Sequence, residues 1–278
     1  MTDTIAATAP IALDRYDPVI VSWSGGDDST ACLAYILSQV PASRVKAVWC
    51  DTGAEHPETY GYIWRMVDAV LPRDLEVLCV RGETVYGESL EAGIRRRGQW
   101  PGAKARYCTK HLKTIPTARL VRRRAWWGGV LVLGQRRAES AHRARLAPFN
   151  AVGACGIPTW RPLLDWTKDD VLAQIARQGW PRNPVYAYQT RGGNCMVCIM
   201  ARPAEIVRTA RRHPDQIARW AALEAEIGHT WGSRKGHSIA NFLATARSQA
   251  FLPRLAPGDL DGEDAAHEGC DSGFCEMG

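Results

Sequence analysis

The sequence predicts an α/β protein: a doubly wound, mainly parallel sheet followed by a C-terminal helical region that contains cysteines. Three observations lead to this prediction. Short apolar segments alternate with segments of helical periodicity, as in parallel strands joined by crossover helices. The short segments are apolar at consecutive positions, which indicates a sheet covered by helices on both faces. After about residue 180 the alternation ends and helical segments follow one another.

Five segments are predicted to be strands because each is short and apolar and is followed by turn or polar residues. They span residues 18–23, 44–49, 75–80, 129–133 and 159–164. In a parallel sheet covered on both faces, ligands bind at the carboxyl ends of the strands. Polar motifs that directly follow the strands are therefore expected to form one site.

Helices are predicted where apolar residues recur at helical spacing. The first two span residues 28–40 and 57–70. The third starts at Thr167-Lys-Asp-Asp170, a capping box with aspartate in place of glutamate. The C-terminal helices are predicted over 203–212, 214–227 and 237–248.

Four parts are expected along the chain. Residues 1–17 are expected to be a flexible leader and 18–180 a nucleotide-binding domain. Residues 181–252 are expected to hold a Cys-x-x-Cys loop and the C-terminal helices. Residues 253–278 are rich in glycine, aspartate and glutamate, which predicts a mobile tail.

Composition limits the classes of protein to consider. The chain has 278 residues, 46% of them hydrophobic, and no apolar run near the ~18–20 residues that a membrane helix needs. Its first residues lack the basic and apolar regions of a secretory signal, so we expect a cytoplasmic protein with no membrane partner. The net charge of +6 and the clustered arginines indicate either solvated helix faces or an anionic partner, a nucleotide or a nucleic acid. Nothing in the sequence predicts an oligomeric state.

The first polar motif, Ser24-Gly-Gly-Asp-Asp-Ser29, lies between the first predicted strand and helix. Its glycines let the backbone approach a ligand closely, and the helix N-terminus adds partial positive charge. The serine hydroxyls can donate to phosphate oxygens. No Gly-Lys-Ser/Thr follows, so this is not a Walker loop, and the glycine spacing of a dinucleotide-binding turn is absent. The loop is either a phosphate cradle or an ordinary capped turn.

Four motifs in order resemble those of one family. The loop resembles the pyrophosphatase loop (PP-loop) of the adenine nucleotide alpha hydrolases. The other three resemble elements of the phosphoadenosine phosphosulfate (PAPS) reductase branch of that superfamily, whose fold the predicted sheet would share. These three are Asp51-Thr-Gly-Ala-Glu-His-Pro-Glu-Thr-Tyr60, Arg106-Tyr-Cys-Thr-Lys-His-Leu-Lys113 and Gly134-Gln-Arg-Arg-Ala-Glu-Ser-Ala-His-Arg143. The resemblance spans about residues 18–200.

The resemblance implies roles for individual residues. The loop would hold the phosphates of ATP or a related adenylate, and Asp28 would lie near Mg²⁺. Asp51 would lie near the adenosine or the activated substrate. The residues implied to bind the nucleotide are Ser24, Gly25, Gly26, Asp28, Ser29, Arg136, Arg137 and Arg143, with Lys110 and Lys113 as further candidates. The residues implied to be catalytic are Asp28, Asp51, Cys108 and Arg137.

Asp27 departs from the resemblance because it stands where many relatives have lysine. A lysine there could place a positive charge near phosphate, and an aspartate cannot. Either Mg²⁺ and nearby arginines compensate, or Asp27 points away. We expect Asp28→Ala to abolish nucleotide turnover, and Asp27→Lys to be tolerated or to improve affinity.

The chain has nine cysteines, an odd number that includes Cys195-x-x-Cys198 after two glycines. This count favours metal or redox chemistry over a disulfide framework. Cys108, Cys195 and Cys198 are suited to Zn²⁺ or an iron–sulfur cluster, and plain thiols remain the alternative. Family members hold a 4Fe–4S cluster on a Cys-Cys pair and a later Cys-x-x-Cys, which implies a cluster on these three. Tyr107 replaces the first cysteine of that pair, so the fourth ligand is open, or Cys155, Cys270 or Cys275 supplies it.

Three functions are consistent with these features. The first is an ATP-dependent, pyrophosphate-releasing sulfur-transfer enzyme, iron–sulfur dependent and similar in type to DNA phosphorothioation and thiolation sulfurtransferases. It would act on a nucleic acid or nucleotide-like acceptor, with a cysteine desulfurase or a thiol reductant as partner. The second is a thiol-dependent adenylyl-sulfate or phosphoadenylyl-sulfate reductase that releases sulfite. The usual Glu-Cys-Gly-(Leu/Ile)-His tail of such reductases is absent, although Cys270 and Cys275 lie in the tail. The third is a non-enzymatic nucleotide sensor.

Overall fold

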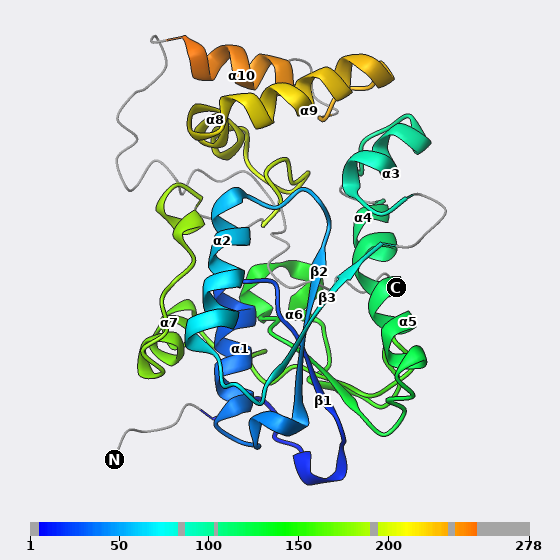
Figure 1. The fold of residues 1–278 in the computed structure, drawn as a ribbon, viewed down its shortest axis with the longest axis vertical. Coiled ribbons are helices and arrows are strands. Elements are labelled where there is room, and N and C mark those ends of the chain that lie inside the picture. The colour runs from blue at the N-terminus through cyan, green and yellow to red at the C-terminus, as the bar shows by residue number, and fades with distance from the viewer. Residues whose placement is uncertain (1–5, 83–86, 103–104, 190–193, 233–236, 249–278) are drawn as a thin grey trace.

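The computed structural model describes residues 6–82, 87–102, 105–189, 194–232 and 237–248. A six-stranded sheet lies at its centre, in the order β3-β2-β1-β4-β6-β5 (Figure 1). All neighbouring strands are parallel except β5 and β6, which are antiparallel. The strands are β1 (Val19–Ser22), β2 (Val45–Asp51), β3 (Glu76–Arg81), β4 (Val130–Leu133), β5 (Phe149–Asn150) and β6 (Thr159–Trp160). The predicted α/β fold class is confirmed.

Helices connect the strands and follow them. The α-helices are α1 (Asp27–Leu37), α2 (Pro57–Arg65), α3 (Leu90–Arg97), α4 (Tyr107–Thr109), α5 (Ile115–Arg123), α6 (Ala141–Ala144), α7 (Lys168–Arg177), α8 (Pro203–Arg212), α9 (Pro214–Ile227) and α10 (Ile239–Arg247). Wider π-helical turns extend α2 over Met66–Val70 and join α4 to α5 over Lys110–Thr114. Short 3-10 helices span Leu13–Arg15, Ala42–Arg44, Arg137–Glu139 and Pro184–Ala187. No helix among the described residues has both the length and the apolarity that crossing a bilayer requires.

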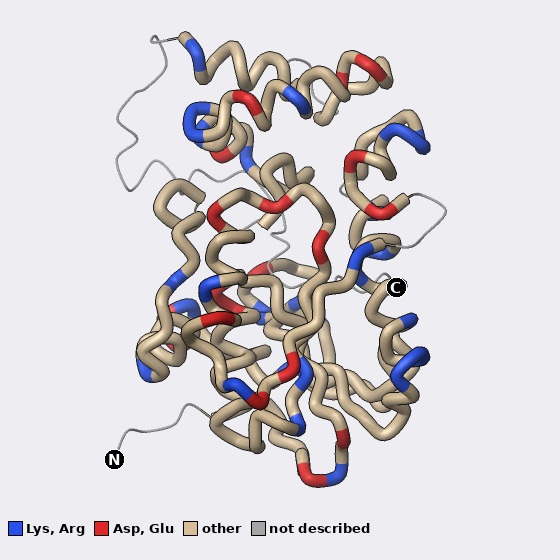
Figure 2. Tube along the Cα trace, in the orientation of Figure 1, with Lys and Arg blue, Asp and Glu red and all other residues tan. Residues whose placement is uncertain are grey.

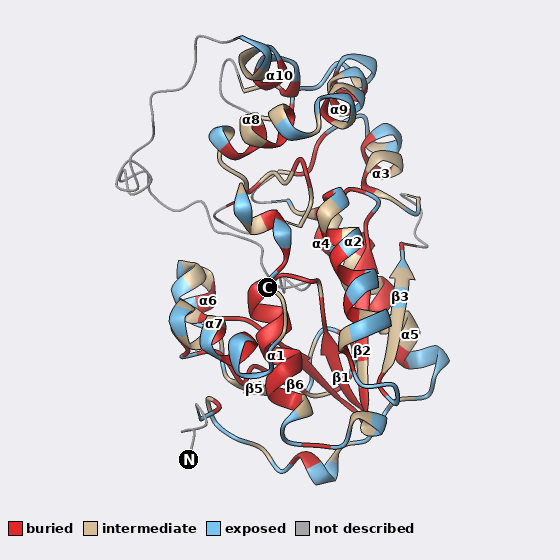
Figure 3. Cartoon of the chain, turned by 60° about the vertical axis from the view of Figure 1, so that its left-hand side comes forward, coloured by how far each residue is buried: buried red, intermediate tan, exposed pale blue. Residues whose placement is uncertain are grey.

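The sheet is buried on both faces because its strand side chains alternate between two cores. Val19 and Val21 belong to the core with α1, α2 and α7, whereas Ile20 belongs to the core with α5. Figure 3 shows α1 and the central strands as continuously buried, whereas β3 at the sheet edge is only half-buried. This two-sided burial explains why β4 is apolar at every position, and β1 at every position but Ser22, rather than at alternate ones.

A separate core lies beyond the carboxyl ends of the strands, under α8, α9 and α10 (Figure 1). Ile206, Ile217 and Phe242 from these helices pack there with Ile94 of α3 and with Val197. Val197 lies between Cys195 and Cys198. The helical region therefore packs together with the Cys-x-x-Cys loop and covers the end of the sheet where ligands bind in this class of fold.

The structure differs from the sequence prediction in several elements, among them the helices α4, α5 and α6, which were not predicted. The strand predicted over 159–164 is only two residues long, because Pro162 cannot donate to a ladder and the chain turns back at Leu164. Strand β5 is too short to give a periodic signal. Helix α3 was not expected, because its Arg95-Arg-Arg97 run hides a short apolar face made by Leu90 and Ile94.

Part of the segment expected to be a flexible leader contacts the sheet domain. Trp160 donates its indole hydrogen bond to the Ala9 carbonyl at 3.1 Å, and Trp166 donates to the Ala6 carbonyl at 2.9 Å. Leu13 is buried in the core beside α1. The tail expected over 253–278 lies outside the described residues.

Candidate functional site

The Ser24–Ser29 loop follows β1 and opens helix α1. Gly25 has a φ of +78°, a conformation that side-chain-bearing residues rarely adopt, so glycine is required there. The Ser29 hydroxyl accepts a hydrogen bond from the Ser24 backbone N–H at 3.1 Å and donates one to the Gly26 carbonyl at 3.0 Å. Gly26 is the N-cap of α1. The loop is thus a tight, internally braced turn at a helix N-terminus.

Asp27 points into the protein rather than away from it. Its side chain is 1% exposed and forms a two-pronged ion pair with Arg182, with the closest oxygen 2.7 Å from the guanidinium. Lys168, the first residue of α7, lies 3.0 Å from the same carboxylate. The cations that compensate Asp27 are therefore Lys168 and Arg182, from outside the four motifs. A lysine at position 27 would face both of them, so the expectation that Asp27→Lys is tolerated has no support in this geometry.

Asp28 is fully buried and ion-paired. The Arg136 guanidinium donates to one carboxylate oxygen at 2.9 Å and to the other at 3.4 Å, and Lys168 lies 3.7 Å away. The backbone of Gly134, just after β4, packs so closely that a Cβ there would lie 2.5 Å from the Asp28 carbonyl oxygen. Asp28 is thereby fixed between α1, β4 and α7.

The Asp28 side chain faces cations of the protein rather than an open position, and its place near Mg²⁺ stays a prediction. Both carboxylate oxygens already accept hydrogen bonds from Arg136, and the side chain has no exposed surface. A metal ligand needs a free carboxylate lone pair directed toward an accessible position. The geometry instead gives Asp28 the role of holding Arg136.

The three arginines expected at the site differ in their surroundings. Arg136 lies at the loop, as described above. Arg137 faces away and binds Asp165 at 2.6 Å and the carbonyls of Ala144 and Leu146. Arg143 is buried and ion-paired with Glu139, whose side chain also accepts from the Arg136 backbone at 2.6 Å. Arg136 is thus the member of the set in direct contact with the loop, and Arg143 supports it through Glu139.

Asp51 ends β2 beside the loop. Its carboxylate accepts hydrogen bonds from Tyr60 at 2.7 Å and from Arg81 at 2.8 Å. Burial opposes ionisation, but the hydrogen bonds from Tyr60, the Gly53 backbone and Arg81 outweigh it and lower the pKa of Asp51. Asp51 is therefore ionised at neutral pH and held in one orientation.

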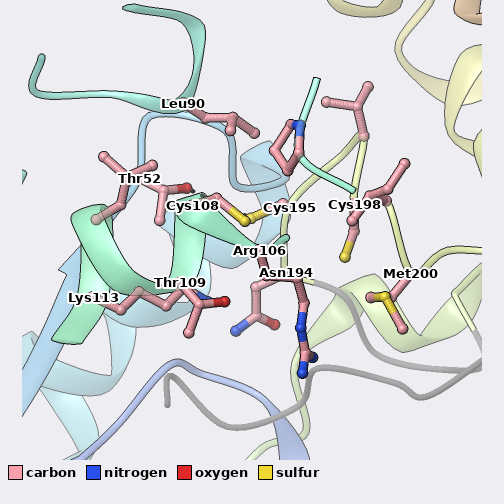
Figure 4. A pocket seen from close by; sticks show the side chains of 14 residues that line it. Thr52, Leu90, Arg106, Cys108, Thr109, Lys113, Asn194, Cys195, Cys198 and Met200 are labelled. Carbon is pink, nitrogen blue, oxygen red and sulfur yellow. Dashed lines mark hydrogen bonds between the residues drawn. The ribbon is translucent and has the colours of Figure 1, made fainter. Parts of the chain in front are cut away.

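Cys108, Cys195 and Cys198 line a single pocket, together with Thr52, Arg106 and Lys113 (Figure 4). Cys108 comes from α4 and the other two come from the Cys-x-x-Cys loop. The Thr52 hydroxyl lies 3.5 Å from the Cys195 sulfur, and the buried Glu55 lies next to both. Burial of the thiol raises the pKa of Cys195 well above its usual value, and Glu55 raises it further. Cys155 lies elsewhere, in the core under α5.

The cysteine pocket is joined to the second motif by backbone hydrogen bonds and to the Ser24–Ser29 loop by one side chain. Residues 194–196 pair with residues 54–56: His56 donates to the Asn194 carbonyl at 2.9 Å, and Met196 donates to the Ala54 carbonyl at 2.7 Å. The Asn194 side chain donates to the Ser24 carbonyl at 2.5 Å. The first two motifs and the Cys-x-x-Cys loop therefore form one continuous site.

The cysteine pocket has the donor atoms that an iron–sulfur cluster needs. The donor chemistry fits, because three thiols face one cavity with Arg106 and Lys113, whose charges suit thiolate ligands. A thiolate buried at Cys195 also needs a nearby cation to offset the cost of burial. In the part of the chain that the structure describes, no three Cys, His, Asp or Glu side chains are grouped to hold a single metal ion. Cys270 and Cys275, considered for the fourth ligand, lie outside the described residues.

Sequence reasoning did not identify several residues that contact the loop. Asn183 donates to the Gly25 carbonyl at 3.0 Å, and the Tyr186 hydroxyl accepts from the Asp27 backbone N–H at 3.0 Å. The Asn183-Pro184 step is a turn signal that marks this segment as ordered. No spacing rule predicts that this segment contacts the Ser24–Ser29 loop, which lies more than 150 positions earlier in the chain.

Comparisons with known proteins agree with the motifs. The family model described as the phosphoadenosine phosphosulfate reductase domain matches residues 18–200. An adenosine 5'-phosphosulfate reductase from Burkholderia cepacia is 31% identical over 204 residues, covering 71% of this chain and 76% of that protein. An uncharacterised 37.8 kDa protein of Escherichia phage 186 is 28% identical over 268 residues, covering 79% and 77%. The crystal structure of the PAPS reductase from Candida auris is 20% identical with a TM-score of 0.44, covering 61% of this chain and 77% of that one. The chain belongs to the phosphoadenosine phosphosulfate reductase domain family.

Proposed function

We propose that the protein is an ATP-dependent sulfur-transfer enzyme that activates its acceptor by adenylation at the Ser24–Ser29 loop. A pocket lined by cysteines next to a nucleotide site supports sulfur chemistry on an activated group. The observation that carries the proposal is the hydrogen bond from Asn194 to the Ser24 carbonyl, which joins the residue before Cys195 to the phosphate loop.

The proposed reaction has two steps. An oxygen of the acceptor attacks the α-phosphorus of ATP, pyrophosphate leaves, and the acceptor proton passes to solvent. The terminal sulfur of a persulfide, supplied by a cysteine desulfurase, then displaces AMP and forms a disulfide with the acceptor. A thiol reductant cleaves that disulfide, leaving a thiol on the acceptor and an oxidised thiol pair. The loop and its cations stabilise the charge that develops on the leaving phosphates.

The chain's own residues would divide this work. Backbone N–H groups at the start of α1 and the Arg136 guanidinium would bind phosphate oxygens. Asp51, fixed by Tyr60 and Arg81, would accept a hydrogen bond from the ribose or the acceptor. Cys108, Cys195 and Cys198 would hold the 4Fe–4S cluster, which when bound supplies iron that can carry sulfur.

The activity is tested by measuring pyrophosphate released from ATP and Mg²⁺ with candidate acceptors: DNA, tRNA and small nucleotides. We expect acceptor-dependent release, lost when Arg136 is replaced by glutamine. If the protein binds no nucleotide and releases no pyrophosphate with any acceptor, the sulfur-transfer proposal is wrong. Binding of ATP without turnover of any acceptor would favour a nucleotide sensor.

The cluster is tested on protein purified without oxygen. We expect absorbance near about 400 nm and about four irons per chain. Cys195→Ser and Cys198→Ser should lose this absorbance, whereas Cys155→Ser should keep it because Cys155 lies outside the pocket. Colourless protein with one zinc per chain would show that the three cysteines hold zinc rather than a cluster. Metal-free protein would show that they are plain thiols.

Reduction of an adenylyl sulfate is the second candidate. The matched relative from Burkholderia cepacia is named adenosine 5'-phosphosulfate reductase, which favours it. A cysteine thiolate would attack the sulfur, AMP would leave, and a second thiol would release sulfite and close a disulfide. Sulfite formed from adenosine 5'-phosphosulfate with a dithiol, without pyrophosphate release from ATP, would decide for this reaction.

The nature of the acceptor is the least constrained part of the proposal. Figure 2 shows that basic residues occupy α3, α5 and α8. The runs on these helices lie in their last turns: Arg95–Arg97, Arg122 with Arg123, and Arg211 with Arg212. Cations in a last turn stabilise the helix by themselves. A nucleic-acid acceptor is thus tested by salt-dependent binding to the whole protein rather than inferred from the number of arginines.

A further inference from the structure

We propose that Lys168 and Arg182 bind the phosphate groups of the nucleotide, and that Asp27 is present in the loop to hold these two cations in place. The proposal rests on the proposed binding of an adenine nucleotide at the Ser24–Ser29 loop. It assigns the positive charge of that site to residues outside the four motifs, and it explains the two carboxylates in a loop built for an anion.

The first observation is the position of the charges. The carboxylates of Asp27 and Asp28 are 1% and 0% exposed, whereas the side chains of Lys168 and Arg182 are 37% and 46% exposed. The negative groups are therefore inside and the positive groups face outward. An anion that approaches the loop meets the cations first.

The second observation is the Tyr186 hydroxyl, which marks the place where an anion would sit. Its oxygen accepts a hydrogen bond from the backbone N–H of Asp27 at 3.0 Å, a donor in the first turn of α1 that has no partner within the helix. Arg182 lies over the ring of this tyrosine, 4.4 Å from its centroid, and Lys168 lies 5.6 Å from it. Both cations therefore pack on the ring of the tyrosine whose hydroxyl reaches the N-terminus of α1.

The third observation is the balance of charge. Two carboxylates, Asp27 and Asp28, are set against three cations, Arg136, Lys168 and Arg182. The cluster carries one net positive charge, and the N-terminus of α1 adds a partial positive charge. Buried carboxylates can hold several cations close together. A phosphate chain carries several negative charges and can bind such a group of cations.

Both cations are held by ordered elements. Lys168 lies within the capping box of α7, in which Thr167 and Asp170 bind each other's backbone N–H groups. Arg182 precedes Asn183, whose side chain binds the Gly25 carbonyl. The donors are therefore placed before a ligand arrives, which lowers the entropy lost on binding.

The test is calorimetric titration of the full chain with pyrophosphate, ATP, adenosine 5'-phosphosulfate and adenosine. Lys168→Gln and Arg182→Gln are compared with Arg73→Gln, which removes an exposed charge before β3, at the opposite end of the sheet. We expect each site variant to bind pyrophosphate and ATP about tenfold more weakly, with a smaller salt dependence. Adenosine, which has no phosphate, should bind all four proteins equally. A larger loss for ATP than for adenosine 5'-phosphosulfate would assign the pair to the β- and γ-phosphates.

Lys168→Arg distinguishes binding from a purely structural role. It keeps the charge, so it should keep the pyrophosphate affinity that Lys168→Gln loses. If Lys168→Gln and Arg182→Gln lower the thermal midpoint but bind pyrophosphate within twofold of the wild type, the cations only support the fold and the proposal is wrong. A wild type that binds neither pyrophosphate nor any nucleotide would instead overturn the proposed function, and this proposal with it.

Discussion

The side chain of Asn194 donates a hydrogen bond to the carbonyl oxygen of Ser24 at 2.5 Å, across 170 positions of sequence. This contact fixes the cysteine pocket against the Ser24–Ser29 loop, because Cys195 follows Asn194 directly. It also holds the Cys-x-x-Cys loop against the motifs that follow β1 and β2, which begin at Ser24 and Asp51.

Asn194→Ala should loosen this connection. The lost hydrogen bond is expected to cost about 1 kcal/mol of folding stability and to weaken nucleotide binding several-fold, because the Ser24 carbonyl helps set the loop. Thermal unfolding and nucleotide titration measure the two effects. Gln39→Ala, which removes an exposed amide past the far end of α1, is the matched control. Equal nucleotide affinity in Asn194→Ala and wild type would show that the loop does not depend on this contact.

Arg136 and Arg137 are neighbours in sequence but should respond differently to replacement. Arg136→Gln leaves the buried Asp28 without its main partner, which is expected to cost about 3–5 kcal/mol. Arg137→Gln breaks an exposed ion pair and two carbonyl contacts, for about 1–2 kcal/mol. Urea unfolding of both variants checks the order. A larger loss for Arg137→Gln would contradict the assignment of Arg136 to the loop.

Gly134→Ala should be strongly destabilising. Its methyl group would lie 2.5 Å from the Asp28 carbonyl oxygen, and backbone on both sides has little room to move. Gly61→Ala is the control, because nothing lies within 4 Å of a Cβ there and alanine favours the interior of α2 by about 0.8–1 kcal/mol. The two substitutions should shift the thermal midpoint in opposite directions. A neutral Gly134→Ala would mean that β4 and α1 can separate at this point.

His56 should make stability depend on pH. Burial lowers its pKa from 6.5 to about 4, so it stays neutral in the folded protein while the unfolded chain takes up a proton below about pH 6.5. The free energy of unfolding should therefore fall as the pH drops from about 6.5 to 4, by up to about 1.4 kcal/mol per pH unit.

His56→Asn should remove this contribution while keeping a polar partner for the Tyr188 hydroxyl, which lies 3.0 Å from the histidine Nδ1. Urea unfolding between about pH 5 and 6.5 measures the change in slope. The window avoids Glu58: burial opposes its ionisation, but hydrogen bonds from Arg212 and Tyr188 lower its pKa to about 2. His229→Asn, at an exposed position, is the control. An unchanged slope in His56→Asn would assign the pH dependence to other groups.

Local patterns predicted most of the sheet and its helices. Val130–Leu133 could be read as a buried strand because every position is apolar, and α7 could be placed by the Thr167–Asp170 capping box. Helix α5 was not predicted either. Helix α3 and strand β5 depend on contacts with α9 and β6 rather than on a periodic signal of their own.

The candidate site was predictable only in part. Asp28 and Asp51 follow strands within recognisable motifs, so their position at one edge of the sheet follows from the fold class. The sequence did not show that Arg136 faces the loop while Arg137 turns to Asp165, because adjacent residues of an irregular turn have no fixed periodicity.

The sequence by itself determined the α/β fold class, the glycine turn at Gly25 and the three thiols of the cysteine pocket. These depend on short-range rules: apolar periodicity, the backbone freedom of glycine, and donor type. Only the tertiary structure decided that Asp27 binds Lys168 and Arg182, and that Asn194 reaches Ser24. Such pairs come together because the loop after β1 meets residues from two later segments, 181–189 and 194–196. A long-range contact of this kind leaves no mark in local sequence.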